Sequence, residues 1–215
     1  MSKKYKYPRT YHAPWSDGLK NDDRRHPDMS IFEDKNVIVS IKMDGENTTW
    51  YKDAIHARSI DSQNANHPSR DFVKGLWAQR KHLITDERRI CGENLYAEHS
   101  IKYVELDSYF YVFSIWHDDI CLSWNATKKI CEELDLPTVP VLYEGIYDAD
   151  KIKTIFQDYD FNEGYVIRVA DTFAHDYDSE TFFNPMAKFV RKNHVQTDRH
   201  WLKNWDKTKI NKLKG

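Results

Sequence analysis

The sequence predicts an α+β fold built mainly from antiparallel sheets. Runs of β-branched and aromatic residues recur along the chain with helical segments between them, without the regular alternation of parallel βαβ units. Charged residues make up 31% of the 215 residues and aromatic residues 14%, which is typical of a globular protein with a substantial core. We expect one domain over residues 1–192 and a short basic segment, 193–215, after it.

The strands are expected where apolar or β-rich runs occur, beginning with Val37-Ile38-Val39-Ser40-Ile41 and Thr48-Thr49-Trp50-Tyr51. The full set is 36–41, 48–52, 89–95, 109–116, 139–144, 164–169 and 187–191. Helices are expected at 70–84, 123–134 and 148–157, the last two with N-caps at Ser123 and Asp148.

Lys42-Met43-Asp44-Gly45 lies between the first two of these runs. Asp-Gly between two β-rich runs predicts a hairpin, which would set Lys42 at the mouth of a strand pair. The plain alternative is a hairpin with an exposed lysine, since the pattern is short.

Further short motifs follow Lys42 in order along the chain. They are Ala57-Arg58-Ser59, Gly92-Glu93-Asn94-Leu95, the aromatic run Tyr109-Phe110-Tyr111-Val112-Phe113, Glu163-Gly164-Tyr165-Val166-Ile167-Arg168 and Lys188-Phe189-Val190-Arg191. This series resembles the covalent nucleotidyltransferase superfamily of ATP-dependent DNA ligases, RNA ligases and mRNA capping enzymes, over about residues 36 to 192. The resemblance implies an adenylation domain with two antiparallel sheets flanked by helices, and the nucleotide held between them.

A lysine nucleophile must be unprotonated, although a free lysine is almost wholly ammonium at neutral pH. Desolvation and nearby cations lower the pKa of an amine, so we expect Lys42 in a closed pocket with basic neighbours. Arg58, Lys188 and Arg191 are the candidates.

The resemblance also implies roles for individual residues. Lys42 is the nucleophile that forms lysyl-AMP, and Asp44 shapes its turn. Arg58 is similar to the basic residue near the ribose and the incoming phosphate. Glu93 is similar to the carboxylate that accepts hydrogen bonds from the ribose. Phe113 is similar to the aromatic residue that stacks on adenine.

Two motif residues near the end of the series would act on phosphate and metal. Glu163 is similar to the metal-associated carboxylate, and Mg²⁺ or Mn²⁺ is the implied ion. Lys188 is similar to the contact to the α-phosphate. The family usually has a second lysine at position 190, where this chain has Val, so Arg191 or Lys192 would take the second basic role.

Each role has a plainer reading from the residues alone. Arg58 and Glu93 could form an ordinary surface ion pair. Phe113 could be only a core residue, and Glu163-Gly164 only a turn. His99 could face the substrate or be a structural histidine.

Asn47, in Lys42-Met43-Asp44-Gly45-Glu46-Asn47, is similar to the residue found in RNA ligases, whereas capping enzymes and DNA ligases usually have Arg there. About 24 residues follow the last motif, which leaves no room for an OB-fold domain after it. The chain is therefore expected to be a compact, phage or bacterial ATP-dependent RNA ligase, active in nick sealing or nucleic-acid repair. The alternatives are an ATP-dependent DNA ligase and a nucleic-acid-binding module without turnover.

The expected partner is RNA or a nicked duplex with 5′-phosphate and 3′-hydroxyl ends. The net charge is only −2, but residues 188–215 contain nine Lys or Arg and two Asp, a local charge of +7. This basic segment, with Trp201 and Trp205, could bind phosphates and bases, or form a helix packed on the domain. Three dispersed cysteines, and no signal peptide or membrane-spanning run, predict a cytoplasmic protein, taken as a monomer.

Overall fold

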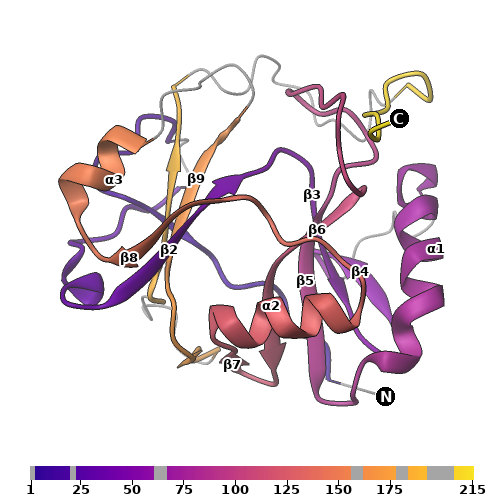
Figure 1. Ribbon diagram of the computed structural model, residues 1–215, viewed down its shortest axis with the longest axis horizontal. Helices are drawn as coiled ribbons and strands as arrows, with labels where there is room; N and C mark the ends of the chain where they lie inside the picture. The colour runs from indigo at the N-terminus through magenta and orange to yellow at the C-terminus, as the bar shows by residue number, and fades with distance from the viewer. Residues whose placement is uncertain (1–2, 20–22, 61–66, 156–161, 178–183, 193–205) are drawn as a thin grey trace.

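Two sheets form the centre of the molecule (Figure 1). The computed structural model describes residues 3–19, 23–60, 67–155, 162–177, 184–192 and 206–215. The two sheets account for every strand within these ranges.

The first sheet has five strands in the order β1-β11-β9-β2-β8. All neighbours are antiparallel except β1 and β11. The strands are β1 (Tyr11–His12), β11 (Met186–Val190), β9 (Gly164–Val169), β2 (Asn36–Lys42) and β8 (Val141–Ile146).

The second sheet has six strands in the order β10-β7-β6-β5-β3-β4, and all its neighbours are antiparallel. A register shift between β5 and β6 falls at Cys91/Gly92. The strands are β10 (Phe173–Ala174), β7 (Ile120–Cys121), β6 (Phe110–His117), β5 (Arg88–Asn94), β3 (Glu46–Trp50) and β4 (Ile55–Ala57).

Helices cover the outer sides of the sheets (Figure 1). The α-helices are α1 (Asp71–Arg80), α2 (Trp124–Glu133) and α3 (Ala149–Ile155), and the 3₁₀ turns are Ser30–Phe32, Pro68–Arg70 and Lys81–Leu83. Val73 of α1 and Ile130 of α2 pack with Trp50 and Ile90 of the second sheet. Ile152 of α3 packs on the first sheet.

A third cluster joins the two sheets to each other. Ile38 of β2 packs with Tyr111 of β6, and Met43 and Leu95 belong to the same buried group. Because Met43 directly follows the last residue of β2, this apolar contact fixes the point where the chain leaves the first sheet.

The predicted fold class, the seven predicted strands and the three predicted helices are confirmed. Ser123 Oγ accepts a hydrogen bond from Ala126 N at 3.2 Å, and Asp148 Oδ1 accepts one from Lys151 N at 3.0 Å. The first predicted helix is shorter than expected, because α1 ends at Arg80 and a 3₁₀ turn follows.

The predicted hairpin at Asp44-Gly45 is wrong. The strands on either side, β2 and β3, lie in different sheets and do not pair. The turn instead carries the chain from the first sheet to the second. It is held by the Asp44 carboxylate, whose Oδ2 accepts hydrogen bonds from Ser100 N and Ile101 N at 2.7 and 2.9 Å. A local hairpin signal thus gave way to long-range contacts.

The helix expected within 193–215 does not form in the part that the structure describes. Residues 206–209 form a turn, and Ile210 and Leu213 make isolated bridges to Ala97 and Leu106. The backbone groups of this segment pair with the loop after β5, which supplies the hydrogen bonds that a helix would make internally. Trp201 and Trp205 lie outside the described residues.

Among the residues described, no helix has the length and apolar character needed to cross a membrane.

Candidate active site

Lys42 is the last residue of β2, at the edge of the first sheet from which the chain crosses to the second sheet. In the β2–β9 ladder Lys42 pairs with Gly164, which Glu163 directly precedes. The Lys42 ammonium forms an ion pair with the Glu163 carboxylate. About 25% of the Lys42 side chain remains exposed.

Glycine at position 164 is required by the close approach of β11. A Cβ atom there would lie 1.9 Å from the Phe189 carbonyl oxygen, far inside van der Waals contact. The Glu163-Gly164 motif therefore combines a carboxylate directed at Lys42 with the one residue type that fits between β9 and β11.

The Asp44-Gly45 turn brings the second sheet to the same place. Gly45 N donates a hydrogen bond to Glu93 Oε1 at 3.1 Å. A Cβ atom on residue 45 would lie 2.5 Å from Asn94 O, so only glycine permits this contact. Glu93 on β5 and Asn47 on β3 face each other in the ladder. The carboxylate of Glu93 is thereby fixed beside the turn that follows Lys42.

Lys188 comes from β11 and forms an ion pair with Asp23, with 3.2 Å between Nζ and Oδ1. His12 Nε2 lies 3.2 Å from the other oxygen of Asp23. Burial and the Lys188 charge lower the pKa of His12 to about 4, so this imidazole is neutral at pH 7. The segment before β2 thus supplies the carboxylate that holds Lys188.

Three carboxylates, those of Glu163, Glu93 and Asp44, dominate the electrostatic surroundings of Lys42, although Lys188 also lies nearby. Burial acts to lower the pKa of Lys42, but the carboxylates of Glu163, Glu93 and Asp44 outweigh burial and raise it. The expectation of a pKa lowered by cations is therefore wrong for the protein without ligand. The motifs indicate which residues gather around Lys42. They do not give the distances, which decide whether carboxylates or cations have the larger effect on its pKa.

Lys188 shows the opposite shift. Burial lowers its pKa, the Asp23 carboxylate raises it, and the nearby Lys42 charge lowers it, with a net decrease. The two lysines are thus close enough to influence each other, and with Glu93 and Glu163 they form one charged group drawn from β2, β5, β9 and β11.

For the other three predicted site residues the structure gives a contact beside this group only for Arg191. Arg58 directly follows β4, is exposed, and comes after the ladder pair Thr48–Ala57. Phe113 is half-buried and packs edge-on against Tyr7, with ring centroids 5.1 Å apart. Arg191 Nε donates to the Asn162 carbonyl at 3.0 Å, next to Glu163 in the chain. The plainer alternative was an ion pair between Arg58 and Glu93. The ion pairs among the described residues do not include this one.

Sequence reasoning missed two residues that hold the site. Asp23 carries no motif, and only the fold brings it to Lys188. Tyr103 accepts a hydrogen bond from Asp44 N through its hydroxyl, at 3.0 Å. The only sequence feature that bears on Tyr103 is the high tyrosine content of the chain, and this does not single out one position.

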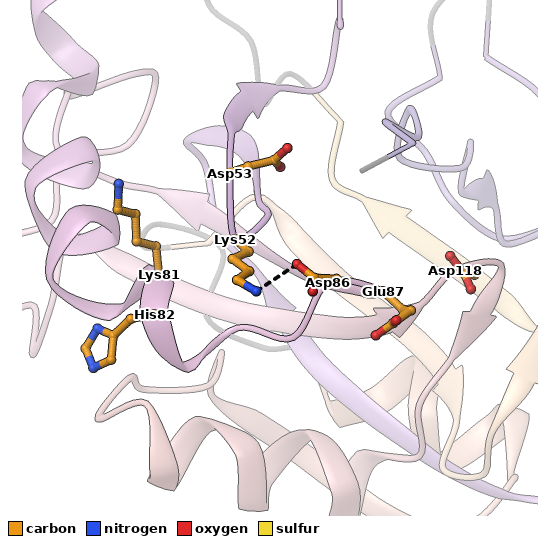
Figure 2. A pocket seen from close by; sticks show the side chains of 7 residues that line it. All are labelled: Lys52, Asp53, Lys81, His82, Asp86, Glu87 and Asp118. Carbon is orange, nitrogen blue, oxygen red and sulfur yellow. Dashed lines mark ion pairs between the residues drawn. The ribbon is translucent and has the colours of Figure 1, made fainter. Parts of the chain in front are cut away.

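An open hollow of about 840 Å³ lies at the opposite end of β5 from Glu93 (Figure 2). Its side chains are of mixed charge, and the Lys52–Asp86 ion pair within it, at 2.9 Å, is exposed. Exposed, mixed charges that pair with each other do not define a ligand site. The hollow is lined by Lys52, Asp53, Lys81, His82, Asp86, Glu87 and Asp118.

Comparison with known proteins places this arrangement in a family. A family model described as RNA ligase matches residues 35–190, which is most of the chain and includes every motif from Lys42 to Lys188. The chain belongs to the RNA ligase family. No curated protein matches it in sequence.

Two solved structures of an RNA ligase share the fold of this RNA ligase family member. A lysine variant of Naegleria gruberi RNA ligase with ATP and Mn aligns with a TM-score of 0.52 and 15% identity, over 76% of this chain and 51% of that one. A second lysine variant, with AMP and Mn, aligns with a TM-score of 0.51 and 14% identity, over 76% and 52%. A putative ATP-dependent DNA ligase from Aquifex aeolicus aligns with a TM-score of 0.48 and 24% identity, over 76% and 46%. The chain spans about half the length of these proteins.

The excess of carboxylates predicts a pH-dependent stability for this RNA ligase family member. Burial, together with Glu163 and Asp44, raises the pKa of Glu93 to about 8, although Lys42 opposes the shift. Because the folded state holds a proton that the unfolded chain releases near pH 4.5, stability falls as pH rises from about 5 through about 8. One pKa unit corresponds to about 1.4 kcal/mol; since Glu93 is only partly buried, we expect a loss of about 1–2 kcal/mol from it.

Glu93→Gln should remove this part of the pH dependence. We expect the variant to match the wild type near pH 5 and to exceed its free energy of unfolding near pH 8, measured by urea denaturation. Glu133→Gln, at an exposed position on α2, is the matched control. Equal pH dependence in wild type and Glu93→Gln would contradict the assignment of the shift to Glu93.

Proposed function

We propose that this chain is an ATP-dependent RNA ligase that joins a 5′-phosphate to a 3′-hydroxyl through lysyl-AMP and an adenylylated polynucleotide. The observation that carries the proposal is that Glu93 of β5, Glu163 directly before β9 and Lys188 of β11 gather around Lys42 at the end of β2. Asn47, with the residue type of RNA ligases, lies opposite Glu93 in the ladder and supports RNA over DNA.

In the first step, Lys42 Nζ attacks the α-phosphorus of ATP. The amine first gives up its ammonium proton to water; then the N–P bond forms, the bond from the α-phosphorus to the bridging oxygen breaks, pyrophosphate leaves, and a second proton passes from nitrogen to water. Lys188, which the Asp23 carboxylate holds in an ion pair, would contact the α-phosphate. Glu93, beside the turn that follows Lys42, would accept hydrogen bonds from the ribose.

In the later steps the AMP group moves to the nucleic acid. The 5′-phosphate oxygen attacks the phosphorus of lysyl-AMP, which releases Lys42. The 3′-hydroxyl then attacks the activated 5′-phosphorus, and AMP leaves as the phosphodiester bond forms. Arg191, bonded beside Glu163, and the exposed Arg58 would assist in binding the nucleotide and the strand ends.

The oxygen donors fit a divalent cation, Mg²⁺ or Mn²⁺. Glu163 would hold it together with phosphate oxygens and water, since within the described ranges no three His, Cys, Asp or Glu side chains are grouped as a complete metal cage. The buried Asn47 Oδ1, which has no hydrogen-bond partner among the described residues, is a further oxygen near Glu93. When bound, the cation would neutralise phosphate charge and offset the carboxylates that raise the pKa of Lys42.

Incubation with α-labelled ATP or GTP and a divalent cation, followed by a denaturing gel, tests the nucleotide chemistry. We expect acid-labile label on the protein from ATP and not from GTP. Label from GTP would indicate capping chemistry. Absence of label from both, in folded protein free of bound AMP, would leave a nucleic-acid-binding module as the better interpretation.

The strand preference needs a second measurement. Nicked duplexes that differ only in a ribose or deoxyribose at the 3′-hydroxyl end should be sealed at different rates, the ribose faster, because a 2′-hydroxyl contact is what distinguishes RNA from DNA. Equal rates on both duplexes would favour the DNA ligase alternative.

A further inference from the structure

The last ten residues lie along the loop that joins β5 to β6 (Figure 1, yellow end). Glu98 N donates to Lys209 O at 3.1 Å, Lys212 N donates to Tyr103 O at 2.9 Å, and Lys214 N donates to Leu106 O at 2.9 Å. The loop, residues 95–109, has no helix or paired strand of its own. Residues 206–215 therefore supply a substantial part of the loop's backbone hydrogen bonds.

Asn211 is the centre of this contact and is fully buried. Its Nδ2 donates to Leu95 O at 2.7 Å and to Ala97 O at 3.3 Å. Its Oδ1 accepts a hydrogen bond from Tyr103 N at 2.8 Å. One side chain thus satisfies three backbone groups of the loop, and its loss would leave them buried without partners.

The same loop holds the turn that follows Lys42. Ser100 N and Ile101 N donate to the Asp44 carboxylate, and the Tyr103 hydroxyl accepts from Asp44 N. Tyr103 is therefore bonded to Asn211 through its backbone and to Asp44 through its side chain. Asp44 is two residues from the amine that the proposed function makes the nucleophile.

We propose that Asn211 is a positioning residue for the Lys42–Asp44 turn, so that the C-terminal segment forms part of the support of the adenylation site. This rests on the proposed function. A displacement of about 1 Å at a reacting group can reduce a rate by about 10²-fold. The loop has no regular secondary structure of its own, so without Asn211 it could shift by such a distance. Asp44, which the loop holds, would then shift with it.

The test uses the full chain with Asn211→Leu and Asn211→Asp, and measures label transfer from ATP to the protein. Asn211→Asp keeps the acceptor for Tyr103 N but sets a carboxylate against two carbonyl oxygens. We expect the rate constant at saturating ATP to fall about 10–100-fold, with KM for ATP changed less than about threefold. Lys214→Ala, which removes an exposed ion pair of the same segment, is the control and should keep the wild-type rate.

A double-mutant cycle separates positioning from general stability. Tyr103→Phe removes only the acceptor for Asp44 N. If Asn211 acts through Tyr103, the effects of Tyr103→Phe and Asn211→Leu on the rate constant will be less than additive. Full additivity, or wild-type rates in both folded Asn211 variants, would overturn the proposal.

Hydrogen exchange keeps the two proposals distinguishable. A wild-type protein that takes no label contradicts the proposed function. The exchange of the Ser100 and Ile101 amides still reports on the loop in that case. Exchange at least about tenfold faster in Asn211→Asp, and unchanged in Lys214→Ala, supports the positioning role, whereas equal protection in all three proteins contradicts it.

Discussion

Lys42→Ala is expected to abolish label transfer from ATP to the protein, with a loss of at least about 10⁴-fold, because the nucleophile of a covalent step has no substitute. Lys188 is the other amine in the group, but it is held by Asp23 and belongs to β11. The measurement is the denaturing gel with α-labelled ATP. Label retained by Lys42→Ala would remove the basis of the proposed function.

Two further variants make this result specific. Lys52→Ala removes a lysine at the opposite end of the second sheet, where it pairs with exposed Asp86, and should label like the wild type. Lys42→Arg keeps a cation beside Glu163 but offers no free amine, since a guanidinium does not deprotonate in proteins. We expect Lys42→Arg to fold and to take no label.

Lys42→Arg matters because Lys42 also balances the carboxylates around it. Lys42→Ala leaves Glu163, Glu93 and Asp44 without their common cation, and this raises the pKa of Glu93 further. A defect of Lys42→Ala alone could therefore reflect a disturbed pocket. A defect shared with Lys42→Arg points to the missing nucleophile.

The convergence of Lys42, Glu93, Glu163 and Lys188 was predictable through the resemblance of the ordered motifs to the nucleotidyltransferase superfamily. Each motif lies at a strand end or next to a glycine that permits a close approach, and such local features are visible in a single sequence. The long strands were predictable for the same reason, because a run of five or more β-branched or aromatic residues carries its own signal.

The contacts that hold the site were not predictable from the sequence. Asp23 and Asn211 come from segments without a motif, and only the folded chain brings them to Lys188 and Tyr103. The strands β1, β4, β7 and β10 have two or three residues each, too few to show a period. The turn at Asp44-Gly45 has the residues of a hairpin. Its conformation is fixed instead by hydrogen bonds from the backbone of Ser100 and Ile101, 56 and 57 residues further along the chain.

Lys188→Ala is expected to reduce label transfer about 10²–10³-fold, the usual cost of removing one group that stabilises charge developing on a reacting oxygen. The effect should appear in the rate constant at saturating ATP and persist across the pH range, because the cation is gone at every pH. Lys188→Arg should recover part of the rate, since arginine holds phosphate well but with a different shape. Wild-type rates in folded Lys188→Ala would contradict the assigned contact.

Asp23→Asn is the variant that ties this effect to the charge of Lys188 rather than to the packing of β11. The Asp23 carboxylate raises the pKa of Lys188, while burial and Lys42 lower it, so its removal must lower that pKa further. Lys188 in Asp23→Asn then loses its proton at a lower pH than in the wild type. We expect the alkaline fall of the label-transfer rate to move to lower pH in Asp23→Asn, and the same shift to be absent when Lys188 is arginine, because a guanidinium stays charged. An identical shift in the double variant Asp23→Asn/Lys188→Arg would assign it to another group.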